Sequence, residues 1–130
     1  MSKRKTYLCI GLLALFTVLC SGCQSEFGGS ADEACLEKME QDILALAGEP
    51  LCSDSTECRY IGFGSKPCGG PWRYLVYSIS TVDTVELVKR VEEYNEYERC
   101  LNRRYGRVSD CSVPIPPRLG CRNGRCVDLQ

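Results

Sequence analysis

The chain has no histidine among its 130 residues. This absence excludes the Ser–His and Cys–His pairs that activate nucleophiles, and it excludes histidine metal sites. From residue 23 onward no two cysteines are separated by two residues, so the signature of thioredoxin-like redox centres and zinc ribbons is missing there. The sequence therefore predicts a protein that is not an enzyme and that holds no cofactor or metal ion.

Lysine is also scarce, because only Lys38, Lys66 and Lys89 follow the first 22 residues. None of them lies in a recognisable Ser–Lys catalytic motif. The chain from residue 23 onward contains 13 Lys and Arg residues and 17 Asp and Glu residues, which gives a net charge of −4. Nine of the acids lie in residues 24–57, whereas seven arginines lie in residues 99–125. A net negative chain with no basic tail is not expected to bind nucleic acid.

A long apolar run is missing as well. Residues 8–19 are apolar almost throughout and follow three basic residues, Lys3, Arg4 and Lys5. A transmembrane helix needs roughly 20 apolar residues, so this run is too short to span a membrane. A basic start and a short apolar run are typical of a signal peptide.

The apolar run ends in Leu19-Cys20-Ser21-Gly22-Cys23. This string resembles the lipobox of bacterial lipoproteins, in which small residues precede the lipid-bearing cysteine. The resemblance implies cleavage before Cys23, a diacylglycerol on its sulfur and a membrane-anchored mature domain. One position departs from the family pattern, since Cys20 stands where Leu, Val or Ile is usual. Cleavage by the general signal peptidase is the alternative.

The residue after the candidate lipid site is Gln24. In lipoproteins of Gram-negative bacteria an Asp here favours the inner membrane, so the resemblance implies the cell envelope, with the outer membrane favoured. Residues 24–30 have the composition of a short flexible tether. The predicted organisation is a signal peptide (1–22), a lipidated cysteine with its tether (23–30) and one globular domain (31–130).

The number of cysteines supports lipidation independently. Cleavage before Cys23 removes two of the 11 cysteines, and the lipid occupies a third. Eight thiols remain, an even number able to form four disulfides in an oxidising compartment. The pairing is left open. The eight predicted disulfide cysteines are Cys35, Cys52, Cys58, Cys68, Cys100, Cys111, Cys121 and Cys126.

Two helices are predicted, over residues 31–47 and 84–104. Ser30 and Asp83 each precede an acid by three residues, which is the form of a capping box. Apolar residues recur at helical spacing in both segments, and the acids of the first helix are expected to form a solvated face. The predicted core stripes are Cys35, Met39, Ile43 and Leu46 in the first helix, and Leu87, Val91, Tyr94, Leu101 and Tyr105 in the second, with Glu98 as the one break.

Strands are predicted on either side of the turn-rich residues 64–71. Residues 59–63 and 72–79 are rich in aromatic and β-branched side chains and are expected to pair as an antiparallel hairpin. Near the end of the chain, Asn123-Gly124 is a strong signal for a two-residue hairpin turn. The predicted fold is α+β, a small disulfide-rich domain with two helices packed on a short antiparallel sheet.

The hairpin around Asn123-Gly124 places Cys121 and Cys126 opposite each other on one face. Two arrangements fit this register. The two cysteines bond across the hairpin, or both point inward and staple other elements of the domain.

A rigid turn, Cys68-Gly-Gly-Pro, precedes the first candidate binding residues, Trp72, Arg73 and Tyr74. Exposed aromatic residues beside an arginine are typical of interface anchors, and a carbohydrate-stacking platform would use the same residues. The alternative is a tight turn with only a structural role.

A second candidate surface is basic. Arg99, Arg103 and Arg107 recur at every fourth position and so share one face of the second helix. They suit a phosphate, a lipid head group or an acidic partner, or else they complement the helix C-terminus. The candidate binding residues of this second set are Arg103, Arg107 and Arg118.

The segment between Cys111 and Cys121 reads SVPIPPRLG. Its Ile115-Pro116-Pro117 resembles the end of the reactive loop of Bowman-Birk protease inhibitors, which implies protease binding. The loop is two residues longer than in that family, and Pro114 stands where the family has Ser just past the scissile position. A proline-rich connection held by its neighbouring cysteines is the alternative.

Together these features predict a lipid-anchored, non-catalytic envelope module that binds a protein or glycan partner, with inhibition of a hydrolase as one form. A structural envelope protein is the second hypothesis, and an enzyme of an unrecognised type is the third.

Overall fold

The computed structural model describes residues 29–130 and confirms the α+β class. The elements in chain order are α1 (Gly29–Ala47), the 3-10 turn η1 (Ser55–Glu57), β1 (Cys58–Phe63), β2 (Arg73–Ser78), α2 (Thr84–Tyr105), β3 (Leu119–Arg122) and β4 (Arg125–Asp128). The predicted single sheet is instead two separate antiparallel pairs, β1–β2 and β3–β4. The signal peptide, Cys23 and the tether up to residue 28 lie outside the described residues.

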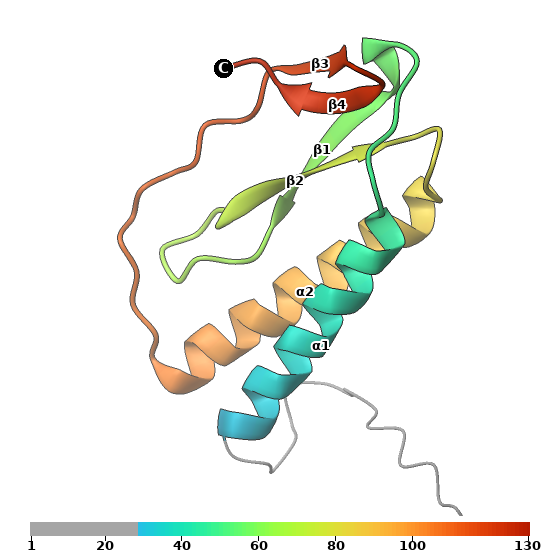
Figure 1. Ribbon diagram of the computed structural model, residues 1–130. Helices are drawn as coiled ribbons and strands as arrows, with labels where there is room; N and C mark the ends of the chain where they lie inside the picture. Colours follow the sequence, from blue (N-terminus) through green and yellow to red (C-terminus); the bar gives the residue numbers. More distant parts are fainter. Residues whose placement is uncertain (1–28) are drawn as a thin grey trace, which may run out of the picture.

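The two helices lie side by side and antiparallel, with the β1–β2 hairpin over them and β3–β4 at the far end (Figure 1). The core lies between these layers. Leu87, Val91 and Leu101 of α2 are fully buried, and Ile43 of α1 is 2% exposed. No helix within residues 29–130 combines the length and the apolar character needed to cross a membrane.

The ends of α2 follow the sequence prediction closely. Asp83 is the N-cap, and its carboxylate accepts bonds from the backbone N–H groups of Val85 and Glu86. The helix stops at Gly106, which adopts the left-handed conformation with φ 58°. Glycine adopts this left-handed conformation without a steric penalty, so Gly106 ends the helix. The helix extends one residue beyond the predicted boundary at residue 104.

The start of α1 differs from the prediction in two ways. The helix begins at Gly29, so Ser30 lies inside the first turn and is not the N-cap. Asp32 was expected on a solvated face, yet it is only 1% exposed. That prediction was wrong for Asp32 because periodicity shows which face is apolar but not which polar residue has partners across a helix interface.

The β1–β2 hairpin pairs as predicted, with Ile61 opposite Leu75 and Phe63 opposite Arg73. Phe63 stacks on Tyr94 of α2, with ring centroids 4.7 Å apart, and this contact seats the hairpin on the helix. Burial raises the pKa of Tyr94 to about 12.

The turn between β3 and β4 is the predicted Asn123-Gly124 turn, with φ values of 51° and 74°. Two successive positive φ values define the hairpin turn that matches strand twist. Cys121 lies opposite Cys126, as expected. Both then bond elsewhere, Cys121 to Cys52 and Cys126 to Cys58, so the structure selects the second of the two arrangements open from sequence.

A third disulfide joins Cys68, in the loop between β1 and β2, to Cys111 beyond α2. Disulfides therefore connect six of the eight predicted cysteines to one another. Cys35 and Cys100 are disulfide-bonded as well, and the identity of their partners stays a prediction.

The charge polarity of the sequence is not preserved in space. Glu33 of α1 pairs with Arg107, Glu40 pairs with Arg73, and Glu49 lies 2.5 Å from Arg125. Acids of the first third of the chain thus pair with arginines of the last third, at Arg107 and Arg125, and with Arg73 of β2.

Candidate functional site

Three polar residues on one face of α2 hold the loop that follows β1. Asn95 accepts from Gly64 N at 2.7 Å and donates to Gly62 O at 3.0 Å. Asn102 donates to Ser65 O at 2.6 Å. These bonds hold the backbone of the loop against the helix, because they give its peptide groups hydrogen-bond partners on α2.

Glu98 completes this set and explains the break in the apolar stripe of α2. It is 9% exposed, and its carboxylate accepts from Ser65 N at 2.5 Å and from the indole Nε1 of Trp72 at 3.0 Å. Sequence reasoning treated Glu98 as an interruption. A charged residue at a core position was the one available signal that the residue had buried partners.

Trp72 packs over the same loop. An added Cβ at Gly64, where φ is 83°, would lie 2.5 Å from Cδ1 of Trp72, so only glycine fits. Lys66 Nζ lies 5.1 Å from the centre of the Trp72 ring. Trp72 is 43% exposed, but its indole N–H donates to Glu98 of α2.

The structure does not bring the predicted trio together on one surface. Arg73 turns toward the helices, where it pairs with Glu40 at 2.6 Å and lies 4.6 Å from the Phe63 ring. Tyr74 takes the opposite face by strand alternation and packs edge-on against Tyr60, with centroids 5.1 Å apart. The aromatic platform expected from sequence is therefore divided between two faces.

The second predicted set is divided too. Arg103 and Arg107 line a shallow groove of about 230 Å³ that also includes Arg99 and Lys66. Arg99 and Arg103 both pair with Glu96, and Arg107 pairs with Glu33. Because acids already neutralise these arginines, the groove has little excess charge to offer an anion.

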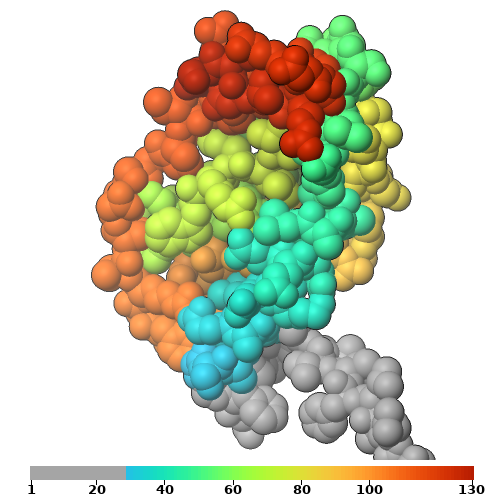
Figure 2. Space-filling model, viewed as in Figure 1, coloured from blue at the N-terminus to red at the C-terminus, as the bar shows by residue number. Residues whose placement is uncertain are grey.

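Arg118 lies outside this groove, on a segment that runs along the outside of the molecule. This segment, residues 107–118, connects the end of α2 to β3 and forms an orange ridge along one side (Figure 2). We call it the strap. Val113 is 71% exposed and Ile115 is 75% exposed, so the strap presents two apolar side chains to solvent.

The first end of the strap is fixed by Lys66. This lysine is 7% exposed, and its Nζ donates to Asp110 Oδ1 at 3.0 Å and to Ser112 O at 2.7 Å. Bonds from Ser112 and Lys66 hold the pKa of Asp110 below its usual value. The Cys68–Cys111 disulfide lies beside this contact, so a covalent bond and a buried cation clamp the same point.

The other end of the strap is fixed on the C-terminal hairpin. Arg118 N donates to Asp128 Oδ1 at 3.1 Å, and Arg118 O accepts from Leu129 N at 2.8 Å. Gln130 Nε2 donates to Pro116 O at 2.9 Å. Cys121, three residues further on, is bonded to Cys52. The strap is therefore an exposed segment with a disulfide near each end.

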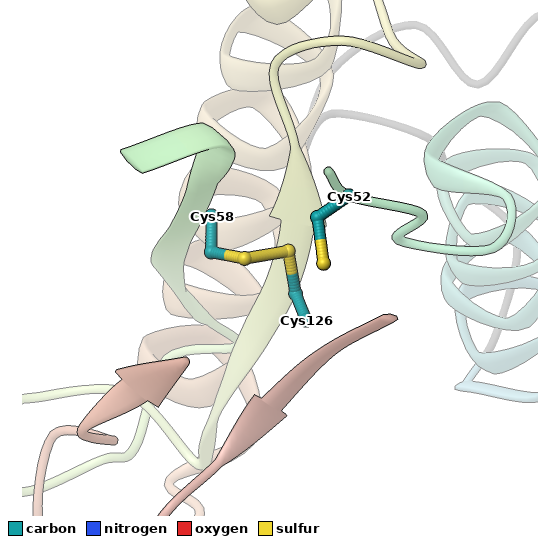
Figure 3. Close-up of side chains that lie close together, drawn as sticks. All are labelled: Cys52, Cys58 and Cys126. Carbon is teal, nitrogen blue, oxygen red and sulfur yellow. A yellow bond between two sulfur atoms is a disulfide. The ribbon is translucent and has the colours of Figure 1, made fainter. Parts of the chain in front are cut away.

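Three sulfur atoms meet between β1 and the C-terminal hairpin, those of Cys52, Cys58 and Cys126, all within 4.8 Å of one another (Figure 3). Cys58 and Cys126 are bonded to each other, and Cys52 is bonded to Cys121. Metal ions bind the thiolate form of cysteine. As disulfides these sulfurs carry no thiolate. The Cys58–Cys126 bond joins β1 to β4, and the Cys52–Cys121 bond joins the loop before η1 to β3.

A further groove, of about 330 Å³, lies between α1 and α2. Apolar residues Met39 and Ile43 line it together with Asp42, Glu86 and Glu93. No histidine or cysteine accompanies these carboxylates, and Arg90 pairs with Glu86 at 2.6 Å.

Glu98 gives the domain a pH-dependent stability term. Burial raises the pKa of Glu98 above its ordinary value of 4.5, against the bonds from Ser65 and Trp72. A raised folded-state pKa stabilises the fold fully below the unfolded pKa, and that contribution is lost as pH rises through the folded pKa. The unfolding free energy of the wild type relative to Glu98→Gln is therefore expected to fall as the pH rises from 4.5 through the raised pKa of the folded state.

Urea denaturation across this pH range checks the expectation, because the amide that replaces the carboxyl group in Glu98→Gln cannot titrate. Glu92→Gln, at an exposed acid on the same helix, is the matched control and should follow the wild type at every pH. Parallel wild-type and Glu98→Gln curves would contradict the assignment.

In comparisons with known proteins, the chain matches no family model, and no curated protein or solved structure is significantly similar to it.

Proposed function

We propose that this protein is a lipid-anchored lipoprotein of the cell envelope, a non-catalytic module that binds a protein partner through its strap. The observation that carries the proposal is the strap itself. It holds Val113 and Ile115 exposed while disulfides at Cys111 and Cys121 tie its flanks to the domain. Inhibition of a hydrolase is one form that such binding takes.

A clamped segment suits binding for an energetic reason. A flexible loop loses conformational entropy when it is ordered by a partner, which weakens the complex. The strap has already lost that freedom on folding, through its disulfides and the bonds at Ser112, Pro116 and Arg118. Exposed apolar side chains on a rigid support are the usual anchors of protein interfaces.

A protein partner is favoured over a glycan by the positions of the aromatic residues. Glycan recognition would need aromatic faces gathered on one surface. Trp72 instead packs over its own loop and donates to Glu98, while Tyr74 packs on Tyr60 on the other side of the hairpin.

A non-catalytic role is supported by the state of the buried acid Glu98. Both of its carboxylate oxygens accept hydrogen bonds, one from Ser65 and one from Trp72. A general acid or base must reach a substrate proton. Glu98 holds a loop instead, and it lines neither the groove between α1 and α2 nor the groove that Arg103 and Arg107 line.

The anchor and the strap are compatible in space. The described chain starts at Gly29, beside Tyr105 at the end of α2. The strap begins at this end of the molecule and runs to the opposite end, where β3 and β4 lie (Figure 1). A lipid on Cys23 would hold the domain by the end where the strap begins and leave the length of the strap accessible.

Lipidation makes a sharp prediction about the cysteines. The three assigned bonds use six of the eight predicted disulfide cysteines, and Cys35 and Cys100 are disulfide-bonded as well. An acylated Cys23 sulfur takes part in no disulfide, so Cys23 is expected to be absent from every disulfide of the mature protein.

Intact mass and peptide mapping of protein extracted from membranes check this prediction. The expected mass begins at acylated Cys23, with no alkylatable thiol before reduction. Cys23→Ser should move the protein to the soluble fraction. A peptide joining Cys23 to another cysteine would contradict lipidation.

Binding through the strap is tested separately by site-specific photo-crosslinking in cells. A photoreactive residue at Val113 is expected to give one discrete adduct, and the adduct should vanish when Ile115 is changed to Asp. The same residue at Val85, which is 82% exposed on α2, is the control and should give none. An envelope defect on deletion that Ile115→Asp protein fully rescues would favour the structural alternative.

A further inference from the structure

Two disulfides of the domain lie side by side. The sulfur atoms of Cys52, Cys58 and Cys126 are within 4.8 Å of one another, although Cys52 is bonded to Cys121 and the other two are bonded to each other. In Figure 3 the Cys52 sulfur lies beside the Cys58–Cys126 bond. Disulfides exchange when a thiolate attacks a bonded sulfur. A thiolate at Cys52 would therefore have a second disulfide within its reach.

Backbone hydrogen bonds hold Cys52 at this position without help from its sulfur. Cys52 N donates to Gly124 O at 2.9 Å, and Cys126 N donates to Pro50 O at 2.8 Å. These two bonds fix the short segment before η1 on the β3–β4 hairpin. Cys52 therefore stays beside Cys126 when the bond to Cys121 is opened.

The two disulfides differ in their access to solvent. Cys58 and Cys126 are 5% and 6% exposed, whereas Cys121 is half-buried in β3. The rate of exchange depends on access to the sulfur that is attacked, so an external thiolate reaches Cys121 before the buried bond. Attack on Cys121 expels Cys52 as a thiolate, next to the second disulfide.

The same four cysteines have another pairing within reach. Cys121 lies directly opposite Cys126 in the β3–β4 register. Opposite residues of an antiparallel pair have Cα atoms about 4.5–5.5 Å apart, inside the range of about 4.4–6.8 Å that a disulfide spans. Cys52 and Cys58 are close in the chain, and their sulfurs lie within 4.8 Å. We call Cys52–Cys58 with Cys121–Cys126 the local pairing, and the observed bonds the crossed pairing.

We propose that these four cysteines form an exchange unit, which the cysteine thiolate of a thiol–disulfide oxidoreductase switches from the crossed to the local pairing. The inference concerns the regulation of the strap and so rests on the proposed binding function. The crossed pairing joins the β3–β4 hairpin to β1 and to the loop before η1. The local pairing contains no bond between this hairpin and the rest of the domain.

Each step of the exchange breaks one sulfur–sulfur bond and forms another. The external thiolate attacks the Cys121 sulfur and expels the Cys52 thiolate. Cys52 attacks the Cys58 sulfur and expels the Cys126 thiolate. Cys126, opposite Cys121 in the hairpin, then displaces the external sulfur from Cys121. The external thiolate is regenerated, so the exchange needs a catalytic thiol and no net oxidant or reductant.

The local pairing would loosen the far end of the strap. The backbones of Pro116 and Arg118 bond to Gln130 and Asp128, at the end of the β3–β4 hairpin. The crossed pairing ties this hairpin to the domain with two covalent bonds. Without them only noncovalent contacts hold it, so the strap regains freedom that a partner must remove again on binding. The switch therefore weakens binding through the strap.

Peptide mapping after exposure to thiol tests the exchange. The disulfide-intact mature protein is incubated with reduced glutathione without air, and free thiols are then alkylated. Trypsin cleaves between Cys121 and Cys126, and a glutamate-specific protease cleaves after Glu57, between Cys52 and Cys58. Peptides of the local pairing are expected to appear, without an accompanying increase in alkylated Cys52, Cys58 or Cys126.

Two controls show that the neighbouring bond is required. In Cys58→Ala with Cys126→Ala the second disulfide is gone, so Cys121 should accumulate as a mixed disulfide with glutathione. Cys68 and Cys111 are exposed, and neither belongs to a cluster of three sulfurs within residues 29–130. In the wild type they should be found bonded to each other or to glutathione, and in no new internal pair.

A trapped variant connects the exchange to the strap. Cys52→Ala with Cys58→Ala leaves Cys121 and Cys126 to bond with each other, so no alkylatable thiol should remain at either residue. The adduct from a photoreactive residue at Val113 is expected to fall at least ~10-fold in this variant, because the partner must order the strap again. Cys58→Ala with Cys126→Ala keeps one bond to the hairpin and is the matched control, which should retain the adduct.

Three results would each overturn the exchange. They are peptides of the crossed pairing alone after thiol treatment, peptides joining Cys52 to Cys126, and free thiols at Cys121 and Cys126 in the trapped variant. An undiminished Val113 adduct in the trapped variant would overturn the regulation of the strap and leave its binding function standing. Absence of the adduct in the wild type would remove the proposed binding function, while the peptide map still decides the exchange.

Discussion

Replacing Asp32 with Ala is expected to lower the free energy of unfolding by about 3–5 kcal/mol, the range for breaking a buried ion pair on one side. The Asp32 carboxylate accepts from the Tyr105 hydroxyl at 2.6 Å and from the Tyr97 hydroxyl at 3.0 Å, and it lies 3.4 Å from Arg104. Its side chain is 2% exposed. Truncation would remove the buried acceptor on α1 that binds three side chains of α2.

Urea denaturation at neutral pH with disulfides intact measures this loss. Glu33→Ala is the matched control, because Glu33 is the next residue on α1 and pairs with Arg107 while its side chain stays 59% exposed. An exposed pair contributes under about 1 kcal/mol. Similar losses for the two variants would show that Asp32 is not the centre of the helix interface.

The bond to Asp32 also has a spectroscopic consequence. It raises the pKa of Tyr105, since the carboxylate favours the protonated hydroxyl. In Asp32→Ala the absorbance titration of Tyr105 should therefore shift to lower pH, and this readout reports the local contact independently of global stability.

Removing the Cys58–Cys126 disulfide, as Cys58→Ala with Cys126→Ala, is expected to cost about 2–3 kcal/mol of stability. The bond joins residues 68 positions apart, but the Cys52–Cys121 bond still closes nearly the same loop in the unfolded chain, so only the short loop between the two bonds is freed. Both cysteines are buried, at 5% and 6% exposure. A loss of this size should lower the melting temperature by roughly 10–20 °C.

Calorimetry checks the temperature shift, and hydrogen exchange locates it. Exchange should accelerate in β3 and β4, which are held on β1 by this bond. The matched control removes Cys68 and Cys111, whose bond is at the strap, and should leave the β3–β4 amides protected. A Cys58–Cys126 variant within about 1 kcal/mol of the wild type, far below the expected range, would mean that the neighbouring Cys52–Cys121 bond suffices.

The contrast between Asp83 and Ser30 shows where sequence reasoning succeeds. Both residues precede an acid by three positions, and only Asp83 caps a helix. The end of α2 agrees with the prediction because Gly106 and the apolar stripe agree locally. The first turn of α1 instead contains Asp32, whose partners on α2 lie more than 60 positions away in the chain.

The candidate binding residues show the limit of local patterns more clearly. Trp72, Arg73 and Tyr74 are adjacent in sequence, yet strand alternation and three different partners separate them. Composition alone shows that such residues are suited to interfaces. It does not show which of them the domain already uses to hold itself together.

The strap was visible in the sequence as a proline-rich segment between two cysteines. Its significance depends on distant residues. Lys66 and Cys68 fix one end, and Asp128 and Gln130 fix the other. Only these contacts show that the segment is held on the domain at both ends.

The sequence by itself determined the helices, the two hairpins, the α+β class and the use of cysteine as a staple, because capping, turn residues and periodicity act over a few neighbouring residues. Tertiary structure alone decided the bonding of Cys121 and Cys126 to Cys52 and Cys58, the burial of Asp32 and Glu98, and the exposure of Val113 and Ile115. Each of these depends on which distant groups meet when the apolar faces are buried together. Local sequence patterns do not specify these long-range contacts.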